Sequence, residues 1–349
     1  MSVTAEERAA LVRKIALEEG AQLAGIADGR RPVSHAARWL EWLDAGHAGP
    51  MPWLEAHRTL KTDPGQLLPG LRGMLCIAIS SNHRVSDLPD RPRVSQYARG
   101  RDYHRVLRGI LKRVARRLEQ ELGPFSWRVC VDTAPLLERY WAWQAGLGWI
   151  GKNCLLINRR WGSWLLLGEL LTDLELMPDT PGRESCGRCE RCLQACPTQA
   201  LPAPGVLDAA RCLSAQTIEN RAPELPAELH PLPENWIFGC DSCQLCCPWN
   251  RPGRDADGLP AGHPGLLPDP DLERIIARAQ WPDERSSPEE WARFWEELTR
   301  GKALRRMTLP MLRRNLAALW GRSGENKSDP RGSPLWENNR SAEDRERGL

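Results

Sequence analysis

The sequence contains no run of about 18 uncharged apolar residues, which is the length that a helix needs to cross a bilayer. Its apolar stretches, such as residues 164–167, are much shorter, so no membrane span is predicted. The first residues, MSVTAEERAALVRK, include acidic side chains and lack the apolar segment and the small-residue cleavage site of a secretion signal. We therefore expect a cytoplasmic protein.

Lysine, phenylalanine and tyrosine are scarce. Six of the 48 basic residues are lysines, and three Phe and three Tyr stand beside 16 Trp. Arginine suits phosphate because its guanidinium makes two parallel hydrogen bonds, but a GC-rich genome gives the same bias without a functional reason, and we favour that explanation. Since the formal net charge is only +3, any affinity for nucleic acid must come from local patches.

A chain of 349 residues, 41% of them hydrophobic and 27% charged, can fold into two or three domains. Residues 1–175 alternate helical and strand-like patterns and predict an α/β domain. A capping box at Thr4 and Glu7 begins its first helix. The other predicted elements are helices at 103–122 and 135–145, strands at 23–27, 75–80 and 127–131, and a hairpin of strands at 155–158 and 164–171.

The composition changes to Cys, Pro and Gly over residues 176–265. Such a segment buries too little apolar surface to offset its ordering entropy, so it needs metal or covalent staples. Residues 266–322 predict a helical domain. Its helices are expected at 271–279, 288–298 and 309–320. Residues 323–349 are polar and interrupted by proline, which predicts a disordered tail.

Nine of the twelve cysteines lie between Cys186 and Cys247, and a reducing compartment disfavours disulfides. The first four have the C-x2-C-x2-C-x3-C-P spacing of a bacterial ferredoxin, in which three cysteines bind one [4Fe-4S] cluster and the fourth reaches a second cluster. A zinc site is the alternative, but zinc does not need a third evenly spaced cysteine or the terminal Cys-Pro. The sequence therefore predicts iron–sulfur clusters.

A second group of cysteines between residues 240 and 247 supplies ligands for a second cluster. Following the ferredoxin crossover, one cluster is expected to be bound by Cys186, Cys189, Cys192 and Cys247. The other is expected to be bound by Cys196, Cys240, Cys243 and one further cysteine. Cys212 and Cys246 are the candidates for that place, and we favour Cys212 because Cys246 shares a tight turn with its neighbour. Two adjacent clusters transfer electrons one at a time.

The electrons need an acceptor, and a crevice near Asp132 is the first candidate. Asp132 follows a predicted strand, at the edge where α/β sheets place their ligands, although it could equally be only the cap of the next helix. Further along, three glycines between residues 146 and 151 precede Lys152 and Asn153. They could be turn residues, but they also suit a backbone that approaches a large cofactor.

Several segments together resemble the epoxyqueuosine reductases, cobalamin-dependent iron–sulfur enzymes of queuosine biosynthesis in tRNA. The matching segments are YARGRDYH at 97–104, VDTAPLLER at 131–139, GWIGKN at 148–153, residues 162–169, both cysteine groups with Arg211 and Cys212 between them, and CPWN at 247–250. The resemblance extends from about residue 5 to residue 320. Cys154 stands where threonine is usual in this family, and Cys246 where an aliphatic residue is usual.

The resemblance implies a nitroreductase-like α/β domain that holds cobalamin against a ferredoxin-like domain with two [4Fe-4S] clusters. The implied reaction removes the epoxide oxygen of epoxyqueuosine at the tRNA wobble position, with electrons from an unidentified donor. Reduced cobalt supplies a reductant that no side chain offers, and Asp132 is the predicted proton donor, with a pKa raised by burial against the corrin. The residues predicted to bind cobalamin are Tyr97, Asp132, Lys152, Asn153, Ser163 and Glu169.

The resemblance also places tRNA contacts on the C-terminal helices. A base modified in the anticodon loop must leave its stack, while the rest of the RNA is held through phosphates. The predicted contacts are Arg305, Arg306, Arg313, Arg314 and Asn315. The alternative is that the two Arg-Arg pairs are solvated surface. We expect a monomer, because no long exposed apolar stripe is evident.

Three other functions fit parts of the pattern. A corrinoid reductive dehalogenase would share the cofactors, but such enzymes are typically exported with a twin-arginine leader, which this N-terminus lacks. An RNA-binding protein with structural clusters would have redox-inert clusters and no corrinoid. A simple electron carrier would not need the large α/β domain.

Overall fold

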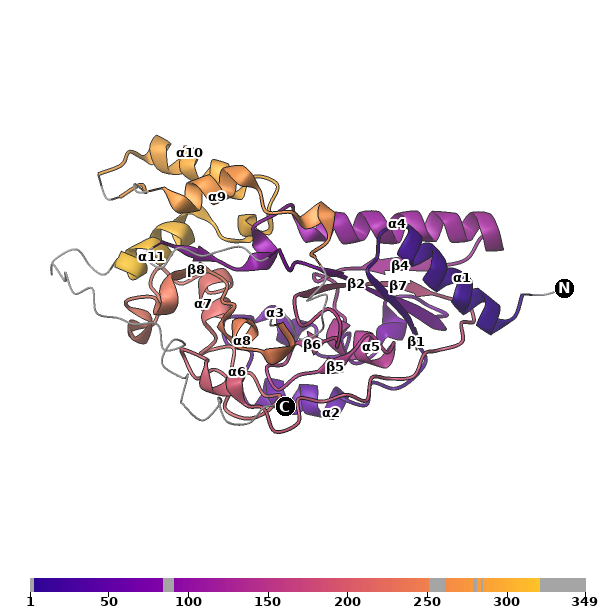
Figure 1. Cartoon of the computed structure of the whole chain (residues 1–349). Coiled ribbons are helices and arrows are strands. Elements are labelled where there is room, and N and C mark those ends of the chain that lie inside the picture. The colour runs from indigo at the N-terminus through magenta and orange to yellow at the C-terminus, as the bar shows by residue number, and fades with distance from the viewer. Residues whose placement is uncertain (1–2, 84–90, 251–260, 279–280, 284, 321–349) are drawn as a thin grey trace, which may run out of the picture.

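The largest unit of the protein is a four-stranded sheet in the order β1-β2-β7-β4 (Figure 1). The structure is a computed structural model that describes residues 3–83, 91–250, 261–278, 281–283 and 285–320. The strands are β1 (Leu23–Asp28), β2 (Gly73–Ser80), β4 (Trp127–Cys130) and β7 (Leu165–Thr172). All three neighbouring pairs are antiparallel.

Both faces of this sheet are covered, which explains why its central strands are almost wholly apolar. Successive side chains of a strand point to opposite faces. In β2 the odd-numbered residues from Leu75 to Ile79 pack under α1 (Ala5–Glu18) and α4 (Tyr103–Leu122). The even-numbered residues from Met74 to Ala78 pack against α5 (Glu138–Gln144). Two further helices, α2 (Ala36–Asp44) and α3 (Trp53–Ala56), lie in the connection between β1 and β2.

The predicted mixture of helices and strands in the first domain is confirmed, and α1 begins at the predicted capping box of Thr4 and Glu7. The strand directions, however, differ from the parallel sheet that alternating helices and strands usually indicate. The last strand of the domain, β7, enters the sheet between β2 and β4 and runs antiparallel to both. Alternation along the sequence carries no information about such an insertion.

The predicted hairpin of residues 155–171 is wrong. The first of its strands, β6 (Leu156–Ile157), pairs with β5 (Trp149–Ile150) in a separate two-stranded sheet, while β7 joins the main sheet. A tight turn does lie between β6 and β7, where Asn158 and Gly162 form an isolated bridge and Gly162 has a φ of +68°. The predicted turn is therefore present, but β6 and β7 do not pair with each other on either side of it.

The described part of the cysteine-rich segment contains only short elements. Apart from 3-10 turns, they are α6 (Arg191–Gln194), α7 (Leu213–Ile218), α8 (Ser242–Leu245) and β8 (Trp236–Phe238). Strand β8 pairs in parallel with β3 (Arg93–Val94), which precedes α4. Within the described part of the cysteine-rich segment, β8 is therefore the only strand that pairs with another strand, and its partner β3 belongs to the first domain.

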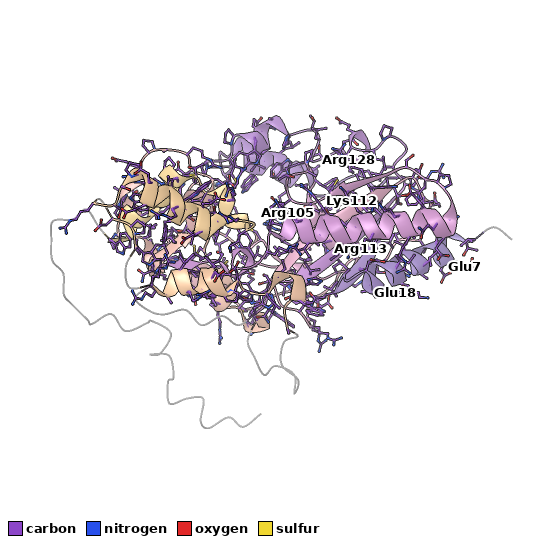
Figure 2. All side chains as sticks on the ribbon, turned by 90° about the horizontal axis from the view of Figure 1, so that it is seen from above. Glu7, Glu18, Arg105, Lys112, Arg113 and Arg128 are labelled. Atoms are coloured by element: carbon purple, nitrogen blue, oxygen red, sulfur yellow. The ribbon has the colours of Figure 1, made fainter. Side chains whose placement is uncertain are left out.

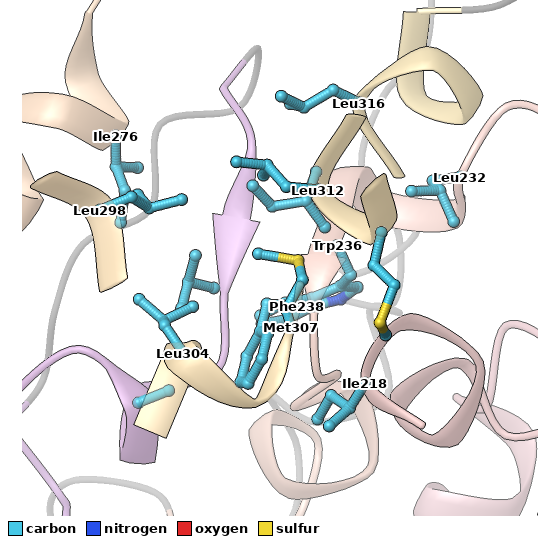
Figure 3. Close-up of a cluster of buried hydrophobic side chains, with 14 of the residues drawn as sticks. Ile218, Leu232, Trp236, Phe238, Ile276, Leu298, Leu304, Met307, Leu312 and Leu316 are labelled. Carbon is cyan, nitrogen blue, oxygen red and sulfur yellow. The ribbon is translucent and has the colours of Figure 1, made fainter. Parts of the chain in front are cut away.

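The predicted C-terminal helices correspond to α9 (Pro270–Ala277), α10 (Pro288–Thr299) and α11 (Leu309–Trp320). Figure 3 shows their apolar side chains packed against Trp236 and Phe238 of β8. One core therefore joins the helices to the cysteine-rich segment across the predicted boundary at residue 265. The predicted disordered tail lies outside the described residues. No described helix is long and apolar enough to cross a bilayer.

Candidate active site and cluster-binding segment

Asp132 lies in the loop between β4 and α5, and its backbone has a φ of +53°. Residues with a Cβ rarely adopt this left-handed conformation, and such outliers concentrate at functional sites. The side chain of Asp132 is 53% exposed. The loop thus presents a carboxylate at the surface of the domain.

Three residues at the start of α4 surround this carboxylate. Asp102 caps the helix by accepting a hydrogen bond from the backbone N–H of His104. The Oδ1 atom of Asp102 also lies 2.7 Å from Nδ1 of His104, and Nε2 of His104 lies 3.1 Å from Oδ2 of Asp132. Tyr103 is also a neighbour of Asp132 and favours its ionised form. The imidazole of His104 is therefore held between two carboxylates.

The two carboxylates determine where the proton resides. Burial disfavours the charged form of His104, but its hydrogen bonds to Asp102 and Asp132 and their charges outweigh burial and raise the pKa of His104 to about 9. Burial favours neutral Asp132, but the hydrogen bond and charge of His104 outweigh it and lower the pKa of Asp132. From these side chains alone, Asp132 therefore has a lowered pKa, and the raised pKa expected for burial against the corrin stays a prediction. At neutral pH, His104 carries the proton and Asp132 is ionised.

Two further ionisable groups hold the Asp132 loop from behind. Glu138, the first residue of α5, accepts a hydrogen bond from the backbone N–H of Asp132. Burial, reinforced by the charge of Asp132, raises the pKa of Glu138 to about 7. The ammonium of Lys61 donates a hydrogen bond of 3.0 Å to the carbonyl of Leu136 in the same loop, and burial lowers the pKa of Lys61. The loop is thus anchored at both of its ends.

Glu169 lies inside the main sheet, at a position of β7 that faces Cys76 of β2 and Cys130 of β4. It is 0% exposed, and neither of its carboxylate oxygens has a hydrogen-bond partner. Burial raises the pKa of Glu169 well above 4.5. Because no atom of the side chain reaches the surface, the prediction that Glu169 contacts cobalamin is wrong.

Three other predicted cofactor residues connect the first domain to the cysteine-rich segment. The ammonium of Lys152 lies 3.4 Å from the glutamate that precedes α6. The amide of Asn153 donates to the carbonyl of Cys243 at 3.4 Å, and the hydroxyl of Ser163 donates to Gln244 at 2.9 Å. Asn153 and Ser163 are only 5% and 4% exposed. Their side chains hold the two parts of the chain together, and contact with cobalamin stays a prediction.

Tyr97 and the glycines before Lys152 also serve internal packing. The ring of Tyr97 lies 5.9 Å from that of Tyr103 and 6.2 Å from that of Phe238, so it supports Tyr103 from behind. A Cβ atom on Gly148 would lie 2.1 Å from the carbonyl oxygen of Ile157. Close approach of backbone to backbone, rather than to a cofactor, therefore explains this glycine. Of the six predicted cobalamin contacts, Asp132 alone is exposed.

The first predicted set of cluster ligands lines one cavity. Its thiols are those of Cys186, Cys189, Cys192 and Cys247. Asn153 and Ile157 of the first domain complete the wall, together with Trp249, whose ring lies 4.8 Å from that of Trp149. Four thiols around one cavity have the donor chemistry of a [4Fe-4S] site.

The second predicted set is also brought together. Burial raises the pKa of Cys212 and Cys243, and neighbouring thiols add to this effect, Cys196 beside Cys212 and Cys240 beside Cys243. Cys240 and Cys243 both have Cys212 as a neighbour. These neighbouring charges favour Cys212 as the fourth ligand, and its assignment stays a prediction.

Cys246 has thiols of the first set as its neighbours. After burial, the groups that most raise its pKa are the thiols of Cys192 and Cys247. Its own sulfur lies 3.5 Å from the carbonyl of Cys243. This position suits a spare thiol beside the first cluster.

Two of the predicted tRNA contacts point into the protein. Asn315 is 0% exposed and donates to the carbonyls of Thr217 and Ile237 at 3.0 and 2.8 Å. The guanidinium of Arg314 donates to the carbonyls of Asn220 and Ala222, both at 2.7 Å. The prediction is wrong for these two residues, because their donors satisfy buried carbonyls rather than phosphates.

The other three predicted tRNA contacts lie nearer the surface but have partners of their own. Arg305 and Arg306 each pair with a carboxylate at 2.7 Å, on α10 and immediately after α7 respectively. The guanidinium of Arg313 lies 5.3 Å from the centre of the Trp291 ring. Contact of these residues with tRNA stays a prediction.

Comparison with known proteins identifies the family. Residues 61–133 match the family described as epoxyqueuosine reductase QueG (DUF1730), and residues 185–250 match the 4Fe-4S double cluster binding domain. The epoxyqueuosine reductase of Synechococcus sp. (strain RCC307) is 42% identical over 313 residues, which are 88% of this chain and 92% of the relative. The chain belongs to the epoxyqueuosine reductase family. The predicted resemblance and the predicted pair of [4Fe-4S] clusters are thereby confirmed.

Solved epoxyqueuosine reductases share the fold. One, crystallised with a tRNA-Tyr stem loop that carries epoxyqueuosine, matches with a TM-score of 0.72 and 28% identity over 88% of this chain and 79% of that one. Another, from Bacillus subtilis, has its catalytic aspartate loop swung out of the active site and matches with a TM-score of 0.68 and 27% identity over the same shares. These family relationships favour a reductase over the dehalogenase, carrier and RNA-binding alternatives.

Sequence reasoning did not assign roles to several residues of this site. Tyr103 and His104 stood in a matching segment, but nothing in their spacing pointed to Asp132, which is 28 residues away from His104. Asp102 carried a recognisable signal, because an aspartate before a helix is a common cap. Lys61 and Glu138 carried none, since their proximity to the loop arises only when the sheet is assembled.

Proposed function

We propose that this protein reduces epoxyqueuosine at the wobble position of tRNA to queuosine, with cobalamin and two [4Fe-4S] clusters as cofactors. The observation that carries the proposal is the exposed Asp132 paired with a protonated His104, in a member of this family that also brings together two sets of four thiols. The complex of a relative with an epoxyqueuosine-bearing stem loop supports the substrate.

The two sets of thiols would hold the clusters, and Asp132 would face the cobalamin. Bound cobalamin would supply a strongly reducing cobalt centre, which the clusters would recharge one electron at a time. Asn153 bonds to the carbonyl of Cys243 and Ser163 to the side chain of Gln244. These contacts hold the cluster segment against the first domain.

Reduction of an epoxide to an alkene takes up two electrons and two protons and releases water. A proton source must therefore stand beside the leaving oxygen, and Asp132 is the exposed group. His104 supplies the proton for this site. Its imidazolium lies 3.1 Å from the Asp132 carboxylate and keeps its proton below about pH 9. The aspartate loop named as catalytic in the Bacillus subtilis relative supports this role.

The test is anaerobic reconstitution with iron, sulfide and cobalamin, followed by mass analysis of nucleosides from tRNA carrying epoxyqueuosine. The wild-type protein should form queuosine. Asp132→Asn should retain cobalamin and about eight iron atoms but lose turnover, whereas Asp271→Asn, a substitution of a residue 73% exposed on α9, should change neither. Normal turnover in Asp132→Asn would refute the role of Asp132, and failure to bind cobalamin would refute the proposed chemistry.

The proposal includes a cytoplasmic monomer and a separate electron donor. Gel filtration of the reconstituted protein, alone and with tRNA, measures whether it is a monomer. Turnover with and without added reduced flavodoxin-type or ferredoxin-type carriers tests the need for a separate electron donor. Without a donor, the reaction must stop once the electrons stored in the protein's own clusters are used.

A further inference from the structure

The basic residues of α4 fall into two groups with different surroundings. On one side of the helix, Arg113 and Arg117 form ion pairs of 2.7 to 3.1 Å with two glutamates at the end of α1. On the other side, Arg108 and Lys112 are exposed, and neither forms an ion pair with a described residue. Figure 2 shows Lys112 on the side of Arg128, and Arg113 on the side of Glu18. One side of α4 is therefore neutralised and the other remains positive.

The positive side borders a groove of about 430 Å³ that leads to the Asp132 loop. Arg108 and Lys112 of α4 line it together with Arg128 of β4, and its far end is formed by residues 133–135. No acidic side chain of the described residues lines it. The guanidinium of Arg108 donates a hydrogen bond of 2.9 Å to the hydroxyl of Thr133, and that of Arg128 donates one of 2.9 Å to the carbonyl of Leu67. These bonds position both guanidinium groups at the groove.

Three cations that pair with no carboxylate in the described part of the chain create a positive potential, which suits an anion with several charges. Arginine is especially suited to phosphate because its fork of N–H groups matches two oxygens. Thr133 directly follows Asp132, so a nucleotide whose base reaches Asp132 brings the phosphates next to it toward this groove. The surface of the C-terminal helices, where the sequence predicts tRNA contacts, is less suitable for phosphates because Arg305 and Arg306 are already paired with carboxylates.

We infer that the groove lined by Arg108, Lys112 and Arg128 binds backbone phosphates of the tRNA anticodon arm beside the nucleotide that enters the active site. This inference rests on the proposed function and adds the surface that holds the RNA. Contacts to phosphates carry no sequence information, so the groove positions the anticodon arm and does not select among tRNAs.

The test uses the reconstituted full-length protein and a fluorescently labelled tRNA-Tyr anticodon stem loop without the modification. Binding is measured by anisotropy between 50 and 200 mM salt for the wild type, K112Q, R128Q and their double variant. R113Q is the matched control, because it removes one positive charge from the next residue of the same helix on its neutralised side. Each groove substitution should weaken binding on the order of tenfold at 50 mM salt and reduce the salt slope by about one.

The outcomes separate this inference from the proposed function. The groove is supported if R113Q binds like the wild type while the double variant binds weakly and shows a raised KM for tRNA with an unchanged kcat. It is overturned if the groove variants bind like the wild type, or if R113Q loses as much affinity as K112Q, and in both cases wild-type turnover leaves the proposed function standing. Absence of RNA binding by the wild type would overturn both.

Discussion

Replacing Glu169 with glutamine tests whether the buried carboxyl group of β7 keeps its proton in the folded protein. The side chain is 0% exposed, and neither of its oxygens has a hydrogen-bond partner. Burial raises the pKa of Glu169 well above its ordinary value of 4.5, the charge of Glu138 adds to this, and the charge of Lys61 opposes it. Glutamine has nearly the same shape and does not ionise, so the substitution removes a titration and changes little else.

The sign of the effect follows from proton binding. Above pH 4.5 the unfolded chain loses the proton of Glu169, while the folded protein keeps it. The folded state then binds more protons, so the wild-type protein loses stability as the pH rises from 4.5 toward the folded pKa. Each pH unit between 4.5 and the folded pKa of Glu169 changes the equilibrium constant of unfolding tenfold, which is about 1.4 kcal/mol per pH unit. The glutamine variant does not bear this cost.

Thermal unfolding of the cluster-loaded proteins at pH 5, 6, 7 and 8 measures the difference. The Tm of E169Q relative to the wild type should rise with pH below the folded pKa of Glu169, by roughly 2 °C per pH unit. At pH 5 the variant should be equal or less stable, because a buried amide without partners costs about 1–3 kcal/mol. E121Q, at an exposed position near the end of α4, is the control and should follow the wild type. Parallel curves for E169Q and the wild type would refute a protonated Glu169.

Three further predictions concern other parts of the molecule. Cys212→Ser should lose about four of eight iron atoms after reconstitution while Cys246→Ser keeps all of them, and equal losses would remove Cys212 from the ligand set. Asn315→Leu should destabilise the protein by about 2–4 kcal/mol, because two buried carbonyls lose their donor, and an unchanged urea midpoint would contradict this. Turnover should fall as the pH rises through about 9, where His104 loses its proton. Asp102→Asn should move that fall to lower pH, since it removes one of the two carboxylates that favour the charged imidazole, and an unmoved profile would assign the titration to another group.

Local signals allowed much of the fold to be predicted from the sequence. The helix predicted at 103–122 has the same bounds as α4, because its apolar residues recur at helical spacing and Asp102 provides a cap. The pair of clusters was equally predictable, since cysteine spacing is itself the signal. The arrangement of strands was not, because β7 pairs with β2 across about 90 residues and nothing in either strand specifies its neighbour.

The errors at the site have a common physical origin. Arg314 and Asn315 are predicted tRNA contacts because the family resemblance places such contacts on the C-terminal helices and their side chains are polar. The pattern of α11 held a contrary signal, since Met311, Leu312 and Leu316 are buried and Asn315 shares their side of the helix. Glu169 offered a similar signal, a single acid within the apolar run LLLGELLT of β7. In both cases the apolar surroundings, rather than the residue type, indicated burial.

Charge at the surface shows why composition predicted so little about RNA binding. A net charge of +3 is compatible with a uniformly neutral surface or with separate positive and negative patches. The distribution of surface charge depends on which arginines form an ion pair with a carboxylate. Sequence alone does not reveal such pairs, since Arg113 and Glu19 are 94 positions apart. Helix α1 therefore neutralises one side of α4 only because the fold packs the two together. Lys112, one position away on the helix, points to the other side and keeps its charge available for a phosphate.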